Sequence, residues 1–108
     1  MGSNLGEFET LVLLALLRLG EDAYGITVRD EITRRTRRRP NLGTVYKALI
    51  RLEVKGLIRS RLGEPTPERG GRRKKHYRVS ATGRRALAMT MVTLREMAAG
   101  LDVVSEAR

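Results

Sequence analysis

Apolar positions in the first part of the chain follow a helical pattern that is wider than one stripe. Between Leu5 and Leu19 apolar side chains fill most positions, with an unbroken run from Leu11 to Leu17. A surface helix usually buries one apolar stripe, so a helix that is apolar nearly all round needs cover on several sides. We therefore predict a helix over residues 5–19 that ends at Gly20, with part of its cover supplied by a second subunit.

Two further helical patterns follow. Tyr24, Val28 and Ile32 recur every fourth residue and predict a helix over residues 24–35. Pro40 disfavours helix at the residue before it, so this helix ends in the arginine-rich stretch that precedes the proline.

A third helix is expected after Asn41, a good N-cap residue, and it ends at Lys55-Gly56. One of its sides carries apolar residues at spacings of three and four, which is typical of a face packed in the core. These residues are Leu42, Val45, Leu49 and Leu52. The opposite side carries Gly43, Thr44, Lys47, Arg51 and Val54.

The period then changes to two. Alternation first appears from Ile58 to Leu62, where Arg59 and Arg61 separate apolar or small residues. It appears again from Lys74 to Val79, where one set is Lys75, Tyr77 and Val79 and the other is Lys74, His76 and Arg78. Residues 63–71, between these stretches, are rich in glycine and proline. This pattern predicts a β-hairpin with a long tip.

A last helix is predicted from Ala81 to Val104, after Ser80 as N-cap. Its apolar residues recur at spacings of four and three, which forms a heptad seam. The seam residues are Leu87, Met91, Leu94, Ala98 and Leu101. Such a helix would be about 36 Å long, and its seam needs a partner. We divide the chain into a domain over residues 4–79 and a dimerisation helix over 80–108, and we expect Phe8, Leu11 and Val12 at the same dimer interface.

Charge is distributed unevenly along the chain. The formal net charge is +10, but residues 34–85 hold 18 basic and three acidic side chains, whereas the remainder is net acidic. A basic middle between acidic ends indicates a face that binds a polyanion. The alternative is a uniformly solvated surface, which the uneven distribution disfavours.

Several functional classes are disfavoured by what the sequence lacks. It has no cysteine, which fits a reducing cytoplasm, and its one histidine, His76, cannot form a zinc site alone. No nucleophile–base pair or paired carboxylates point to catalysis, so we expect neither an enzyme nor a bound cofactor. The apolar run of residues 11–17 is too short to span a membrane.

The predicted order of elements is that of a mainly helical winged helix-turn-helix, whose second helix of the turn pair enters the major groove of DNA. Lysine and arginine there can donate to guanine or phosphate, and a cationic glycine-rich hairpin tip can follow a minor groove or phosphate ridge. The predicted DNA-binding residues are Gly43, Thr44, Tyr46, Lys47, Arg51, Arg69, Arg72, Arg73, Lys74 and Lys75. An RNA- or ribosome-associated protein is the alternative, although side chains cannot read the narrow major groove of A-form RNA.

Motifs in a fixed order along nearly the whole chain resemble the PadR family of transcriptional regulators. The motifs are Leu5-Gly6-Glu7-Phe8-Glu9, Ala23-Tyr24-Gly25, Leu42-Gly43-Thr44-Val45-Tyr46, Leu49-Ile50-Arg51-Leu52-Glu53, Lys55-Gly56-Leu57-Ile58, the stretch from Gly70 to Val79, and Ala81-Thr82-Gly83-Arg84. The resemblance implies a homodimer with a C-terminal dimerisation helix. It also implies repression by binding a double-stranded DNA operator, relieved in many members by a small-molecule effector.

Overall fold

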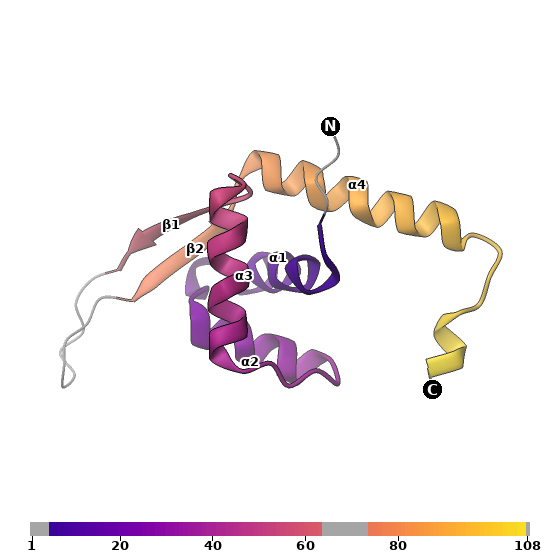
Figure 1. The fold of residues 1–108 in the computed structure, drawn as a ribbon, viewed down its shortest axis with the longest axis horizontal. Helices are drawn as coiled ribbons and strands as arrows, with labels where there is room; N and C mark the ends of the chain where they lie inside the picture. The colour runs from indigo at the N-terminus through magenta and orange to yellow at the C-terminus, as the bar shows by residue number, and fades with distance from the viewer. Residues whose placement is uncertain (1–4, 64–73, 108) are drawn as a thin grey trace.

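The computed structural model describes residues 5–63 and 74–107 and shows the predicted winged helix-turn-helix (Figure 1). Its helices and strands, in chain order, are α1 (Glu7–Leu19), α2 (Gly25–Arg35), α3 (Leu42–Val54), β1 (Ile58–Leu62), β2 (Lys75–Val79) and α4 (Ala81–Ala98). Two short 3₁₀ turns, η1 (Gly20–Asp22) and η2 (Val104–Ala107), complete the described part. None of its helices is long and apolar enough to cross a membrane.

Local capping determines where the first helices begin and end. α1 begins at Glu7 rather than Leu5, because Gly6 is the N-cap and its N–H donates to the Glu9 carboxylate at 3.0 Å. Gly20 ends the helix as predicted, with a positive φ of 60° that glycine adopts readily. Asn41 caps α3 as predicted, since its Oδ1 accepts the Thr44 N–H at 2.8 Å.

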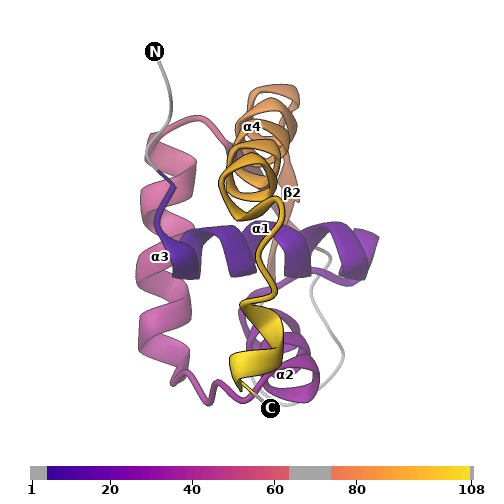
Figure 2. The same cartoon turned by 90° about the vertical axis from the view of Figure 1, so that its right-hand side faces the viewer.

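The hydrophobic core surrounds α1, which packs against α2, α3, α4 and β2 (Figure 2). The buried apolar side chains include Val12, Leu13, Leu16, Val28, Ile32, Val45, Leu49, Leu52, Ile58, Tyr77 and Leu87. Phe8 and Leu11 are half-buried against this cluster. The expectation that Val12 of α1 and Leu87 of α4 lie at the dimer interface is therefore corrected, because both side chains are buried in the core of their own subunit.

The hairpin pairs β1 with β2 in antiparallel register, with Ile58 opposite Val79 and Ser60 opposite Tyr77. A third segment, which the sequence did not suggest, joins this sheet. The Tyr77 N–H donates to the Ala23 carbonyl at 2.9 Å, and Tyr24 forms an isolated antiparallel bridge with His76. This bridge ties the hairpin to the start of α2.

α4 is shorter than predicted. It ends at Ala98 rather than Val104, because the chain turns at Ala99 and Gly100, and Gly100 has a φ of 84°. Its 18 residues correspond to a length of about 27 Å rather than 36 Å. Leu101 consequently lies beyond the helix, and the seam on α4 itself ends at Ala98.

Candidate nucleic-acid interface

The exposed side of α3 carries the contact residues that we predicted for this helix. Val45, Ala48, Leu49 and Leu52 are buried, whereas Gly43, Thr44, Lys47 and Arg51 are exposed. Lys47 makes no ion pair with any carboxylate of the described residues. Within the described residues, the first turns of α3 thus present an ammonium group that has no carboxylate partner, close to the exposed Thr44 hydroxyl, which donates to Asn41 Oδ1 at 3.0 Å.

Tyr46 connects this face to the start of α2. Its side chain is 40% exposed, as expected for an aromatic ring with a wet tip. The ring lies so close to Gly25 that a Cβ built on the glycine would be 2.5 Å from Tyr46 Cζ. A side chain at position 25 would therefore displace the ring, so Gly25 lets Tyr46 brace α3 against α2.

The second half of α3 is held by a buried carboxylate of α1. Glu9 is 5% exposed. It accepts hydrogen bonds from Arg51 Nε at 3.2 Å and from Lys55 Nζ at 3.0 and 3.1 Å. Arg51, which we predicted to contact DNA, is thus bound to the protein in this structure, although its side chain remains 53% exposed. The contacts of Glu9 with Arg51 and Lys55 anchor α3 to α1. Among the described residues, the cation in the N-terminal half of the exposed side of α3 has no such carboxylate partner.

These contacts determine the ionisation of Glu9. Burial raises the pKa of the Glu9 carboxyl, but the Gly6 N–H, Lys55 and Arg51 together lower it further, so its pKa lies below the ordinary value of 4.5. A depressed folded-state pKa contributes stability above the unfolded pKa, and this contribution is lost as the pH falls through the folded value.

We predict that Glu9→Gln flattens the acid dependence of folding stability. The wild type should lose stability as the pH falls below the ordinary glutamate pKa of 4.5, and the variant should lose less over the same range. Urea unfolding midpoints measured at a series of pH values check this. Glu96→Gln is the control, because its carboxylate is exposed and forms no ion pair within the described residues. Identical acid profiles for wild type and Glu9→Gln would contradict the assignment.

Two of the predicted wing residues are described, and both contact the protein. Lys74 Nζ lies 4.5 Å from the centroid of the Tyr24 ring and donates to its hydroxyl at 3.3 Å. Lys75 Nζ lies 3.7 Å from Glu53 Oε1 on α3. Arg69, Arg72 and Arg73 lie outside the described residues.

Glu53 is a structural residue that sequence reasoning missed. It pairs with Lys75 and accepts a hydrogen bond from Ser60 Oγ at 2.6 Å, so it ties α3 to both strands of the hairpin. Glu9 was missed as well. Its position three residues after Gly6 signals a capping box, but its contacts with α3 depend on tertiary packing.

Comparisons with known proteins agree with this arrangement. The sequence model of the PadR-like family of transcriptional regulators matches residues 13–89. A PadR family transcription regulator from hypervirulent Clostridium difficile R20291 is similar, with 26% identity, a TM-score of 0.72, and coverage of 85% of this chain and 91% of that one. A PadR family regulator from Eggerthella lenta DSM 2243 is 28% identical with a TM-score of 0.67, covering 87% and 81%. Comparison with curated proteins gives no match. The chain therefore belongs to the PadR-like family of transcriptional regulators.

Proposed function

We propose that the protein is a homodimeric transcriptional repressor that binds a palindromic DNA operator through the first turns of α3. The observation that carries this proposal is the exposed side of α3, where Thr44 and Lys47 stand next to each other and Lys47 has no carboxylate partner among the described residues. In a winged helix-turn-helix this helix enters the major groove. The predicted basic residues at the hairpin tip and the start of β2 would add contacts with the phosphate backbone of the operator.

The form of α4 supports the dimer. Leu87 packs in the core, and the same side of the helix continues with Met91, Leu94 and Ala98 beyond the edge of the body. Met91 and Leu94 are 44% and 60% exposed, and α4 projects past the other helices in Figure 1. An apolar side that continues past its own core fits against the same side of a second copy.

Two-fold symmetry would place the two copies of α3 about 34–36 Å apart, one turn of DNA, so that both enter the major groove on one side of the duplex. Because α4 is only about 27 Å long, its length alone does not span this separation. The spacing must come from how the two subunits pack together.

Selection of bound sequences from a random duplex pool tests the proposal. We expect an imperfect palindrome with half-site centres about 10 base pairs apart or a multiple of one turn. A single asymmetric consensus would contradict a two-fold dimer on DNA. Equal affinity for duplex RNA at the same salt concentration would favour the RNA-binding alternative.

We predict that Lys47→Ala weakens binding to the selected site by about 1–3 kcal/mol if the lysine reads a base. Its effect on random duplex should be smaller, because base contacts are absent there. Fluorescence anisotropy on both duplexes measures the difference. Arg18→Ala is the control, since Arg18 is an exposed cation in the last turn of α1 rather than on α3. An equal loss on both duplexes for Lys47→Ala would show that Lys47 contacts only phosphate.

A further inference from the structure

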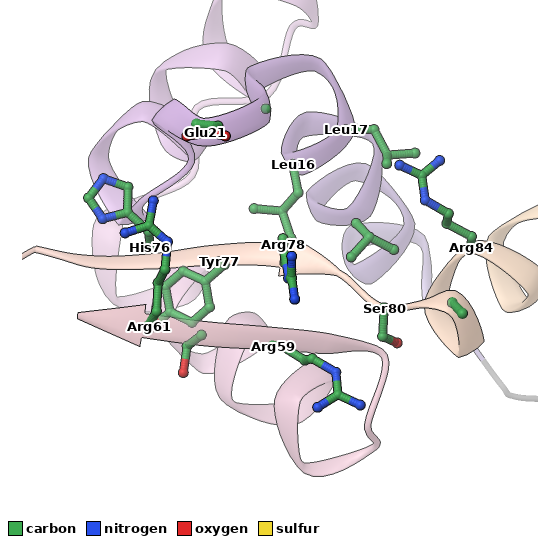
Figure 3. Close-up of a pocket in the computed structure, with 14 residues that line it drawn as sticks. Leu16, Leu17, Glu21, Arg59, Arg61, His76, Tyr77, Arg78, Ser80 and Arg84 are labelled. Atoms are coloured by element: carbon green, nitrogen blue, oxygen red, sulfur yellow. The ribbon is translucent and has the colours of Figure 1, made fainter. Parts of the chain in front are cut away.

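A second basic surface lies on the outer face of the hairpin (Figure 3). An open groove of about 990 Å³ runs between the end of α1, the two strands and the first turn of α4. Its arginines are Arg59, Arg61, Arg78 and Arg84. We call this surface the arginine groove.

Strand alternation turns the arginine groove away from α3. Ser60 and Lys75 point to Glu53 of α3, so their neighbours Arg59 and Arg61 project from the opposite face of the sheet. Figure 3 looks onto this opposite face. A straight duplex on the outward face of α3 would therefore not lie in the groove, because the sheet separates the two surfaces.

The positive charge of the groove is not neutralised by the described part of the chain. Arg59 lies directly opposite Arg78, and Arg61 lies opposite His76. Like charges in directly opposed cross-strand positions destabilise a sheet. No carboxylate of residues 5–63 or 74–107 forms an ion pair with any of the four arginines. Glu21 is the acidic residue among those that line the groove.

The shape and lining of the groove determine the class of ligand. Small-molecule sites are enclosed and mostly apolar, with few polar groups, whereas this groove is open and rich in guanidinium groups. Guanidinium groups bind phosphate oxygens in a planar, two-pronged arrangement. An open row of them therefore suits a chain of phosphates better than one small anion.

We propose that the arginine groove binds the phosphate backbone of a second DNA segment while α3 holds the operator. This inference rests on the proposed function, which supplies the dimer and the first DNA segment. A dimer with two grooves turned away from its α3 helices can hold a second duplex, or a distant part of the same duplex, and so bridge two segments of DNA.

A capture experiment tests the second surface. A duplex just long enough for the selected palindrome is immobilised and saturated with the full-length protein, and a labelled duplex of random sequence is then added over a range of salt concentrations. The groove variant carries Arg59→Gln and Arg78→Gln. The matched control carries Arg18→Gln and Arg85→Gln, which remove the same charge from exposed positions that do not line the groove.

We expect the wild type and the control to capture the random duplex. The groove variant should capture it more weakly, and the dependence of log K on log salt should become shallower by about 1.8, or about 0.9 for each lost phosphate contact. The groove variant should keep its affinity for the immobilised operator, because the groove lies on the face of the sheet turned away from α3. Its melting temperature should be equal to that of the wild type or higher, because the variant removes an unfavourable arginine pair.

Three outcomes would overturn the proposal. In the first, the wild type captures no random duplex. In the second, the groove variant captures as much as the control, which would assign the arginines to another anion or to no ligand. In the third, the groove variant weakens operator binding and capture equally, which would place the groove in the primary contact. Failure of the proposed function would give a different result from failure of this inference. The protein would then show no sequence preference, and Lys47→Ala would not weaken its binding to the short duplex.

Discussion

Gly83→Ala is expected to destabilise the fold by at least about 3 kcal/mol, the upper end of what overpacking usually costs. A Cβ built on Gly83 would lie 2.0 Å from the Leu57 carbonyl oxygen and 2.8 Å from Val79 Cγ1. The Leu57 oxygen cannot easily move, because it accepts the Ser80 N–H at 3.0 Å where the hairpin joins α4. The methyl group must therefore push α4 away from the hairpin. Unfolding in urea measures the loss.

Gly43→Ala is the matched control. A Cβ at Gly43 would lie 3.4 Å from the Asn41 side-chain oxygen, which is ordinary contact, and position 43 is exposed on α3. Alanine is favoured over glycine in a helix by about 1 kcal/mol, so this variant should be as stable as the wild type or slightly more stable. Equal stability of Gly83→Ala and Gly43→Ala would contradict the close approach at Gly83.

Leu94→Glu should separate the proposed dimer and abolish tight operator binding. Two-fold symmetry places the substitution in the interface twice, and each buried leucine contributes about 1.5–3 kcal/mol. We therefore expect the association of subunits to weaken by at least about 3 kcal/mol, or more than 100-fold. Sedimentation at micromolar concentrations measures the subunit mass, and anisotropy measures operator affinity.

Met89→Glu is the control for this face. Met89 is also highly exposed, at 67%, but it lies about 160° around the helix from Met91 at 100° per residue. It should leave the dimer and the operator affinity intact. If Met89→Glu dissociates the protein and Leu94→Glu does not, the subunits meet on the other side of α4.

Local patterns predicted most of the fold because they act within a few residues. Asn41 caps α3, Gly20 ends α1, and the change of period at Ile58 marks the first strand, all as expected. Each of these signals depends on hydrogen bonds or side-chain spacing inside one element. The end of α4 was misplaced because the helical spacing of its apolar residues continues to Leu101, whereas the backbone turns at Gly100.

The candidate site was predictable only in part. Thr44 and Lys47 lie on the exposed side of α3, as the periodicity indicated. Arg51 was on the same predicted side, yet in the folded protein it pairs with Glu9, 42 residues earlier. No pattern along the chain reports that a carboxylate of one helix will lie beside a guanidinium of another.

The amino-acid sequence alone therefore determined the helices, the hairpin and the exposed side of α3, because periodicity and capping are properties of neighbouring residues. The tertiary structure alone decided which apolar side chains are buried within the subunit and which cations have no carboxylate partner in the described part of the chain. It placed Val12 and Leu87 in the core, because α1 is surrounded by four elements of its own chain. It also placed Arg59 opposite Arg78 on a face turned away from α3, because strand register and packing are settled only when distant segments meet.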